Sequence, residues 1–134
     1  MSTTKVATLA AIFLLLLFVA QGIFFIRANS QTIDEAMHLA AGYSYLAKRD
    51  FRIEPQNPPL IKALLALPLF LTYRLPFNPD LQQWRDADGF SIGRDLLYKS
   101  TMPADQMLAW SRLPNLFFGV LLVSLTAWWA SRLC

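Results

Sequence analysis

Two adjacent carboxylates, Asp34 and Glu35, have the side-chain type and position best suited to acid–base chemistry in this chain. Thr32 and Glu35 have the spacing of a capping box, which predicts a helix over residues 33–48. Capping would occupy Glu35, and successive helical residues point about 100° apart, so Asp34 faces another direction with no local task. A free carboxylate of this kind can act as a general base. The alternative is that both acids only stabilise the positive end of the helix dipole.

The same face of the predicted helix carries His38 one turn after Asp34, followed by Ala41, Gly42 and Tyr45. The small residues leave room above the helix, so we expect a small polar bay there. One histidine and one aspartate supply too few ligands for a closed metal site, and no metal site is assigned. His38 is therefore expected to support Asp34 as a hydrogen-bonding partner.

Two cations, Lys62 and Arg112, are candidates for binding a phosphate. Lys62 lies in an apolar segment and Arg112 directly precedes one. As isolated residues, both could instead extend their charged ends to lipid headgroups. The single cysteine, Cys134, excludes an intrachain disulfide and a thiolate metal cluster.

The elements that must position these residues are dominated by two apolar segments. Of the 134 residues, 55% are hydrophobic and 16% are charged, and the mean hydropathy is +0.37. Residues 6–26 and 113–130 would reach about 31 and 27 Å as helices, which is enough to cross a bilayer. Tryptophans flank the second segment, as is typical of membrane boundaries. The first segment could be a signal peptide, but its hydrophobicity continues past Ala20, which favours a membrane anchor.

The 27–112 loop between these spans carries most of the charged residues in near balance. The net charge of +3 therefore does not indicate a nucleic-acid partner. Charge alone does not orient the loop either, because segments longer than about 60 residues are translocated largely regardless of their charge.

Within the loop, a second helix is predicted from Leu60 to Leu71, with Asn57 as its cap. This helix is apolar but too short to cross a bilayer, and Pro68 should kink or end it, so we expect it to lie in the membrane interface. The alternative is a third, kinked span that continues to Phe77. Residues 78–106 are polar and are predicted to form a solvated segment.

Taken together, these motifs resemble the opening of a family-39-like membrane glycosyltransferase of the GT-C superfamily. This group includes protein O-mannosyltransferases and the aminoarabinose transferases of lipid A. The resemblance covers the whole chain. Its motifs are, in order, Asp34-Glu35-Ala36, Ala41-Gly42-Tyr43-Ser44-Tyr45-Leu46, Asp50-Phe51-Arg52, Asn57-Pro58-Pro59-Leu60-Ile61-Lys62 and Arg112-Leu113-Pro114.

The resemblance implies an all-α, multi-pass membrane protein of the bacterial inner membrane. Residues 1–134 would form the amino-terminal fragment of a GT-C fold, with two transmembrane helices joined by an extracytoplasmic loop that carries juxtamembrane amphipathic helices. The isolated fragment is then expected to be inactive.

The implied reaction transfers a sugar, with inversion, from a polyprenyl-phosphate donor to a hydroxyl on a protein, lipid or glycan. By resemblance, Asp34 is the catalytic base, Glu35 and His38 support it, and Lys62 and Arg112 bind the donor phosphate. A divalent cation is left open as a cofactor, and membrane lipids are expected partners. Two other classes remain open, namely a two-span membrane sensor or receptor and a non-catalytic membrane binding protein.

Overall fold

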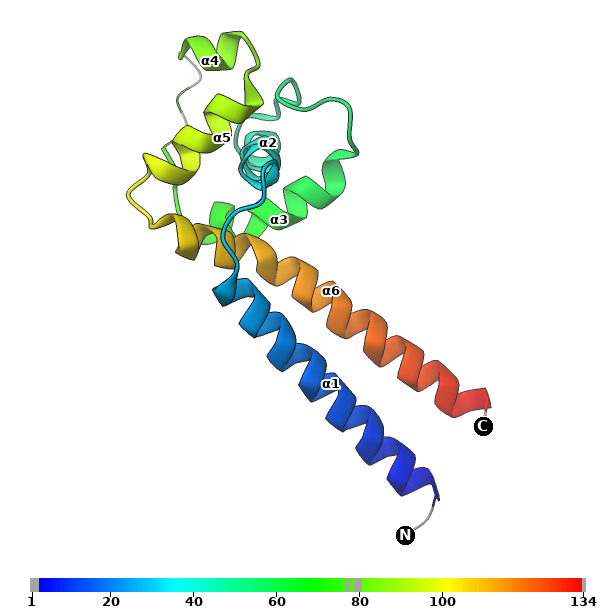
Figure 1. Cartoon of the computed structure of the whole chain (residues 1–134). Helices are drawn as coiled ribbons and strands as arrows, with labels where there is room; N and C mark the ends of the chain where they lie inside the picture. The colour runs from blue at the N-terminus through cyan, green and yellow to red at the C-terminus, as the bar shows by residue number, and fades with distance from the viewer. Residues whose placement is uncertain (1–2, 77, 79–80, 134) are drawn as a thin grey trace. The chain divides into compact units, whose positions relative to one another are not determined.

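The computed structural model describes residues 3–76, 78 and 81–133, and these residues form helices and connecting segments without a β-strand (Figure 1). The chain divides into two compact units. We call residues 1–29 with 114–134 the paired-helix unit, and residues 30–113 the loop unit. The helices are α1 (Thr3–Ala28), α2 (Glu35–Lys48), α3 (Pro59–Thr72), α4 (Gln82–Arg85), α5 (Gly89–Tyr98) and α6 (Ala104–Leu133).

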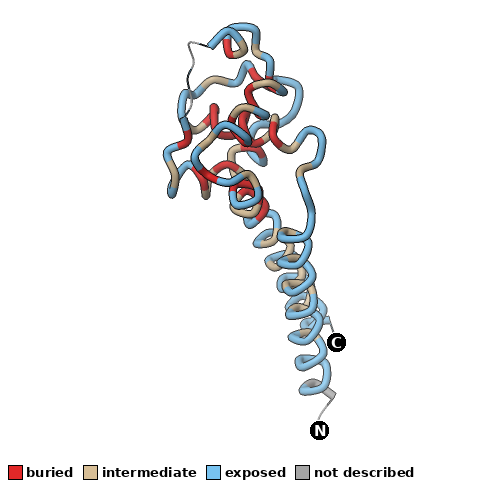
Figure 2. The backbone as a smooth tube through the Cα atoms, turned by 60° about the vertical axis from the view of Figure 1, so that its left-hand side comes forward, coloured by how far each residue is buried: buried red, intermediate tan, exposed pale blue. Residues whose placement is uncertain are grey.

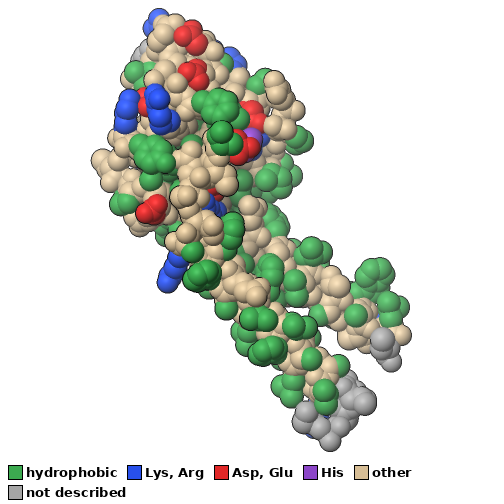
Figure 3. Space-filling model, viewed as in Figure 1, with side chains coloured by type: hydrophobic (Ala, Val, Ile, Leu, Met, Phe, Trp, Pro, Cys, Tyr) green, Lys and Arg blue, Asp and Glu red, His purple; other side chains and the backbone are tan. Residues whose placement is uncertain are grey.

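The paired-helix unit contains α1 and residues 114–133 of α6. Lys5–Ala28 and Ala104–Leu133 are both long and apolar enough to cross a membrane. Many large hydrophobic side chains of both helices are exposed. Figure 2 marks most residues of these helices as exposed, and Figure 3 shows hydrophobic side chains along them. The two predicted spans are therefore found as helices, but α6 begins well before the predicted start at residue 113 and continues through Pro114.

Glycines in the paired-helix unit make room for side chains of the opposite helix. Gly119 lies against the ring of Phe18, and a Cβ atom on this glycine would come within 2.6 Å of the Phe18 Cζ atom. Gly22 faces Leu116 in the same way, and a Cβ atom on Gly22 would lie 2.5 Å from the Leu116 Cδ1 atom. Such small residues allow close helix packing where there is no hydrophobic force between helices, as in lipid.

The loop unit has a hydrophobic core of its own, with α2 packed against both α3 and α5 (Figure 1). Two glycines allow the close approach. A Cβ atom on Gly42 would lie 2.0 Å from the Lys62 carbonyl oxygen, and one on Gly93 would lie 2.6 Å from the Ala36 carbonyl carbon. The prediction of an open bay above Ala41 and Gly42 is therefore wrong, because α3 fills that space.

Helix α3 begins at Pro59, whose missing N–H is tolerated in the first turn. Its N-cap is Pro58, so the prediction that Asn57 caps this helix is wrong. The helix continues through Pro68 and ends at Thr72, which at 14 residues is about 21 Å long. This length contradicts a third span reaching residue 77, which itself lies outside the described residues. A position of α3 in the membrane interface stays a prediction.

The segment from 78 to 106 is not the solvated excursion that its polar composition predicted. Helix α5 buries Ile92, Leu96 and Leu97, and Trp84 of α4 is also buried. The Asp88 side chain accepts a hydrogen bond from the Ser91 amide at 3.1 Å and so caps α5. The dispersed charges concealed an amphipathic helix because they occupy its outer face.

Candidate functional site

Asp34 precedes the first turn of α2 and keeps its carboxylate open to solvent. It is the N-cap residue, yet its side chain makes no capping hydrogen bond. The side chain is 52% exposed, and its Oδ2 atom lies 3.3 Å from the Nε2 atom of His38, one turn further along. The structure therefore brings Asp34 and His38 together as predicted, with the histidine as the neighbour of the exposed carboxylate.

The second ring nitrogen of His38 contacts Glu54, a residue for which the sequence pattern predicted no role. The His38 Nδ1 atom lies 2.6 Å from Glu54 Oε2. Glu54 belongs to the connection between α2 and α3, and its side chain is only 7% exposed. Its burial depends on the packing of those two helices, so no local pattern around residue 54 could have revealed it.

Lys62 reaches the same carboxylate from α3. Its Nζ atom lies 2.9 Å from Glu54 Oε2 and donates to the Glu54 carbonyl oxygen at 3.1 Å. The Tyr45 hydroxyl also donates to that carbonyl, at 3.0 Å, and the ammonium lies 5.6 Å from the centre of the Tyr45 ring. The Lys62 side chain is 5% exposed. The predicted role of Lys62 in phosphate binding stays a prediction, because in this structure the ammonium is paired with Glu54.

The charge state of Glu54 follows from these contacts. Burial alone raises the pKa of a carboxyl group, but hydrogen bonds from Asn57, Lys62 and His38 outweigh it and hold the pKa of Glu54 below its ordinary value. Asn57 donates through Nδ2 to Glu54 Oε1, which is the role the structure gives it in place of a helix cap. Glu54 is therefore a buried anion with three side-chain donors.

Glu35 and Arg112 form a separate ion pair within the loop unit. Arg112 binds both carboxylate oxygens of Glu35, at 2.7 and 2.8 Å, and also donates to the Ser30 carbonyl oxygen at 3.0 Å. Burial opposes ionisation of Glu35, yet the hydrogen bond from Arg112 helps to hold its pKa below the ordinary value. This bidentate geometry fixes the start of α2 against the first part of α6.

The predicted capping box forms only in part. The Thr32 amide donates to Glu35 Oε2 at 3.2 Å, as expected. The Glu35 amide, however, donates to the Thr32 carbonyl oxygen at 3.3 Å rather than to its side chain. Helix α2 consequently begins at Glu35, slightly later than predicted.

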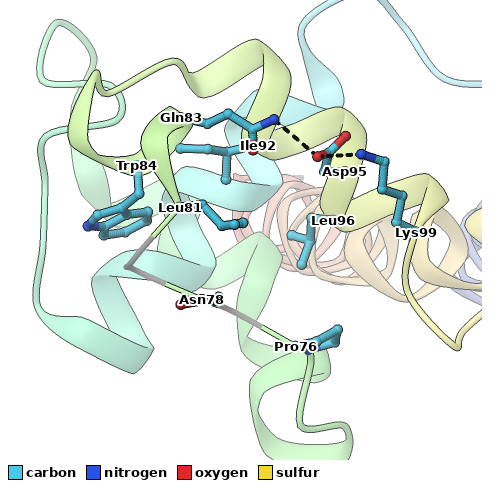
Figure 4. A pocket seen from close by; sticks show the side chains of 9 residues that line it. All are labelled: Pro76, Asn78, Leu81, Gln83, Trp84, Ile92, Asp95, Leu96 and Lys99. Atoms are coloured by element: carbon cyan, nitrogen blue, oxygen red, sulfur yellow. Dashed lines mark hydrogen bonds and ion pairs between the residues drawn. The ribbon is translucent and has the colours of Figure 1, made fainter.

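A pocket of about 300 Å³ lies elsewhere in the loop unit, beside α4 and α5 (Figure 4). None of the five predicted site residues lines it. Asp95, on its wall, accepts hydrogen bonds from Lys99 at 2.8 Å and from Gln83 at 3.2 Å. The Lys99 hydrogen bond is the largest cause of the lowered pKa of Asp95. The polar part of this wall is thus largely paired within itself. Its remaining lining residues are Pro76, Asn78, Leu81, Trp84, Ile92 and Leu96.

Of the predicted residues, His38 and Lys62 contact Glu54, and Asp34 contacts His38. Glu35 and Arg112 instead pair with each other. Across the described residues, no group of three or more His, Cys, Asp or Glu side chains is arranged to hold a metal ion. Comparisons with protein-family models, curated proteins and solved structures found no match to this chain. The arrangement is chemically suited to proton transfer, because an exposed carboxylate contacts an imidazole whose far side is held by a buried anion.

Proposed function

We propose that this chain forms the acceptor side of a membrane glycosyltransferase, which transfers a sugar from a polyprenyl-phosphate donor to an acceptor hydroxyl. One observation carries the proposal. The half-exposed carboxylate of Asp34 is held beside His38 in a helical unit that is joined, at both ends, to helices long and apolar enough to cross a membrane. A donor with a lipid tail must present its phosphate near the lipid headgroups. A site that lies only a few residues along the chain from a helix able to cross the membrane suits such a donor.

In this reaction Asp34 acts as the general base. An acceptor hydroxyl within hydrogen-bond distance of its carboxylate would lose its proton as the oxygen bonds to the anomeric carbon. The bond between that carbon and the phosphate oxygen breaks at the same time, and the electron pair leaves with the lipid phosphate. The absence of a capping bond supports the assignment, because no hydrogen bond to the helix end occupies the Asp34 carboxylate.

The donor phosphate requires cations, and both candidates, Lys62 and Arg112, are already paired with glutamates. Lys62 contacts Glu54, and Arg112 contacts Glu35, with side chains only 5% and 10% exposed. To bind a phosphate, each cation must either leave its glutamate partner or contact the glutamate and the phosphate together. Leaving the glutamate without a cation is costly, because the glutamate is at least partly buried. We therefore propose that their first role is to hold the two glutamates, and that donor binding would require such an exchange.

The proposed location is the extracytoplasmic side of a bacterial inner membrane, with residues 27–112 exposed on that side. This orientation follows from the resemblance of the chain to family-39-like membrane glycosyltransferases. It is needed because lipid-linked sugars of this class are used on that face.

Replacing Asp34 by Asn in the full-length enzyme tests the proposal. Transfer of labelled sugar from a polyprenyl-phosphate donor should fall by at least two orders of magnitude, the usual contribution of a general base. Expression and membrane insertion should not change, because Asp34 is exposed and does not cap α2. Asp86→Asn is the matched control, since Asp86 is also exposed and contacts Gln82 rather than His38. Near-normal transfer by the Asp34 variant would exclude it as the base.

A two-span sensor is the second candidate function. The specific observation in its favour is that the loop unit has its own hydrophobic core and a pocket, as a ligand-binding domain requires. The gene sequence downstream of residue 134 separates the two candidates. Additional apolar spans favour the transferase, and a cytoplasmic signalling helix favours the sensor.

A further inference from the structure

Three side chains form a continuous line from solvent to the interior of the loop unit. Asp34 is 52% exposed, His38 is 29% exposed and Glu54 is 7% exposed. The imidazole joins the two carboxylates, through Nε2 at 3.3 Å and Nδ1 at 2.6 Å. A neutral imidazole has one N–H donor and one acceptor nitrogen, so which nitrogen carries the proton depends on the two carboxylates.

Glu54 is fixed more firmly than either of the other two. Its carboxylate accepts from Asn57 and Lys62 as well as from His38, and its carbonyl oxygen accepts from Tyr45 and Lys62. Burying a charge in this way is favourable only where such partners surround it. The Glu54 carboxylate therefore stays ionised and directed at Nδ1. An ionised carboxylate can only accept a hydrogen bond, so this contact favours the tautomer that carries its proton on Nδ1.

The other charged groups around α2 do not compete for the ring. From α3, Lys62 pairs with Glu54 Oε2 at 2.9 Å. Helix α5 approaches α2 through Gly93 at the backbone of Ala36, and its Asp95 pairs with Lys99. Among the described residues, the imidazole therefore contacts two charged groups, the carboxylates of Asp34 and Glu54.

We propose that Asp34, His38 and Glu54 form a proton relay in which His38 receives the acceptor proton from Asp34 and Glu54 is a positioning residue. The proposal rests on the function proposed above. The Asp34 carboxylate takes the proton from the acceptor hydroxyl as the glycosidic bond forms. Asp34 Oδ2 then passes this proton to Nε2 of His38, and the resulting imidazolium is stabilised by the Glu54 carboxylate. Asp34 returns to its ionised form, and the ring later releases the Nε2 proton to solvent.

The relay can be tested by NMR without any substrate, because His38 is the only histidine in the chain. The chain is labelled with ¹⁵N-histidine in detergent or nanodiscs, and the two ring nitrogens are observed directly. In the neutral imidazole we expect the proton on Nδ1, with the strongly downfield proton resonance of a short hydrogen bond to a carboxylate. Glu54→Gln should remove this downfield resonance. Asp34→Asn should change the Nε2 shift and leave the Nδ1 resonance in place.

Asp86→Asn is the matched control, because Asp86 is an exposed carboxylate that contacts Gln82 rather than His38. It should leave both ring signals unchanged. A proton on Nε2 instead of Nδ1 in the unmodified chain would overturn the relay, and so would a downfield resonance that survives Glu54→Gln. The measurement on the unmodified chain and on the exposed Asp34 variant decides the question even if Glu54→Gln fails to fold.

Sugar transfer by the full-length enzyme gives the second readout. Glu54→Gln should lower kcat on the order of tenfold or more, with little change in the acceptor KM, because the relay acts after the acceptor binds. An effect on KM alone would overturn the relay but not the transferase. If no lipid-linked sugar is transferred by the unmodified enzyme, the proposed function fails, and the NMR result still shows whether the three side chains are linked as described.

Discussion

The carboxylate of Glu54 lies 2.6 Å from Nδ1 of His38, although the two residues are 16 positions apart and belong to different segments. The contact exists because α3 packs closely on α2 at Gly42, next to the carbonyl group of Lys62. The same packing brings the Lys62 ammonium within 2.9 Å of Oε2 of Glu54, the oxygen that also contacts His38. The contacts of Glu54 with His38 and Lys62 thus depend on the packing of α3 on α2. A change that disturbs this packing should also disturb these contacts.

Replacing Gly42 by Ala should separate α2 from α3. The new Cβ atom would lie 2.0 Å from the Lys62 carbonyl oxygen, and a backbone atom cannot move aside as a side chain can. We expect a loss of roughly 2 kcal/mol in stability, as for other overpacked contacts, and loss of the downfield His38 resonance. Thermal unfolding followed by circular dichroism, together with the NMR signal, measures both effects. Gly22→Ala is the control, because its Cβ atom would meet the flexible side chain of Leu116 rather than a backbone atom. Equal stability losses in the two variants would contradict this account.

Removing the charge of Lys62 should destabilise the loop unit. In Lys62→Met the buried Glu54 carboxylate loses a donor at 2.9 Å, and breaking a buried pair costs about 3 kcal/mol or more. The double variant Lys62→Met with Glu54→Leu should regain part of this loss, since no buried charge is left unpaired. Thermal unfolding in detergent provides the comparison, with Lys48→Met as an exposed lysine control on α2. If the double variant is less stable than Lys62→Met, the pair is not the reason for the loss.

The two lowered carboxyl pKa values predict where stability depends on pH. Glu35 and Glu54 have pKa values below the ordinary 4.5 in the folded chain, so the folded state favours their ionised forms. Their contribution is fully present above pH 4.5 and is lost as the pH falls through the folded pKa values. The melting temperature should therefore fall as the pH is lowered below 4.5, and less steeply in Glu54→Gln than in the unmodified chain. An identical acid profile for both proteins would show that Glu54 does not contribute.

The Arg112–Glu35 pair should control the opening of the first turn of α2. Arg112→Lys keeps the charge but cannot bind both oxygens of Glu35 in the same planar geometry. Losing one charge-assisted hydrogen bond, about 1.5 kcal/mol, should raise exchange of the hydrogen-bonded Glu35 and His38 amides roughly tenfold. Hydrogen–deuterium exchange with mass spectrometry measures this, and amides within α5 serve as the internal reference. Unchanged exchange near Glu35 would mean that the start of α2 is held by other contacts.

Different parts of this structure follow from the sequence to different extents. The long apolar segments predicted both helices of the paired-helix unit, because hydrophobicity over about 20 residues is a local property. The exposed carboxylate of Asp34 and its contact with His38 also follow locally, from the spacing of one helical turn. The contacts of Glu54, by contrast, require Gly42 and Lys62 to meet across two helices, and no local pattern encodes that meeting.

The orientation of the loop unit provides the final prediction, since the proposed reaction requires Asp34 to be extracytoplasmic. In a Cys134→Ser background, Asp86→Cys introduces a single cysteine at an exposed position of the loop unit. We expect a membrane-impermeant thiol reagent to label this cysteine in intact cells. Ser131→Cys, near the end of α6, should be labelled only after the membrane is opened, because a span of this length would carry it to the opposite side. The reverse pattern would place Asp34 in the cytoplasm, away from any extracytoplasmic lipid-linked sugar, and would exclude the proposed transfer.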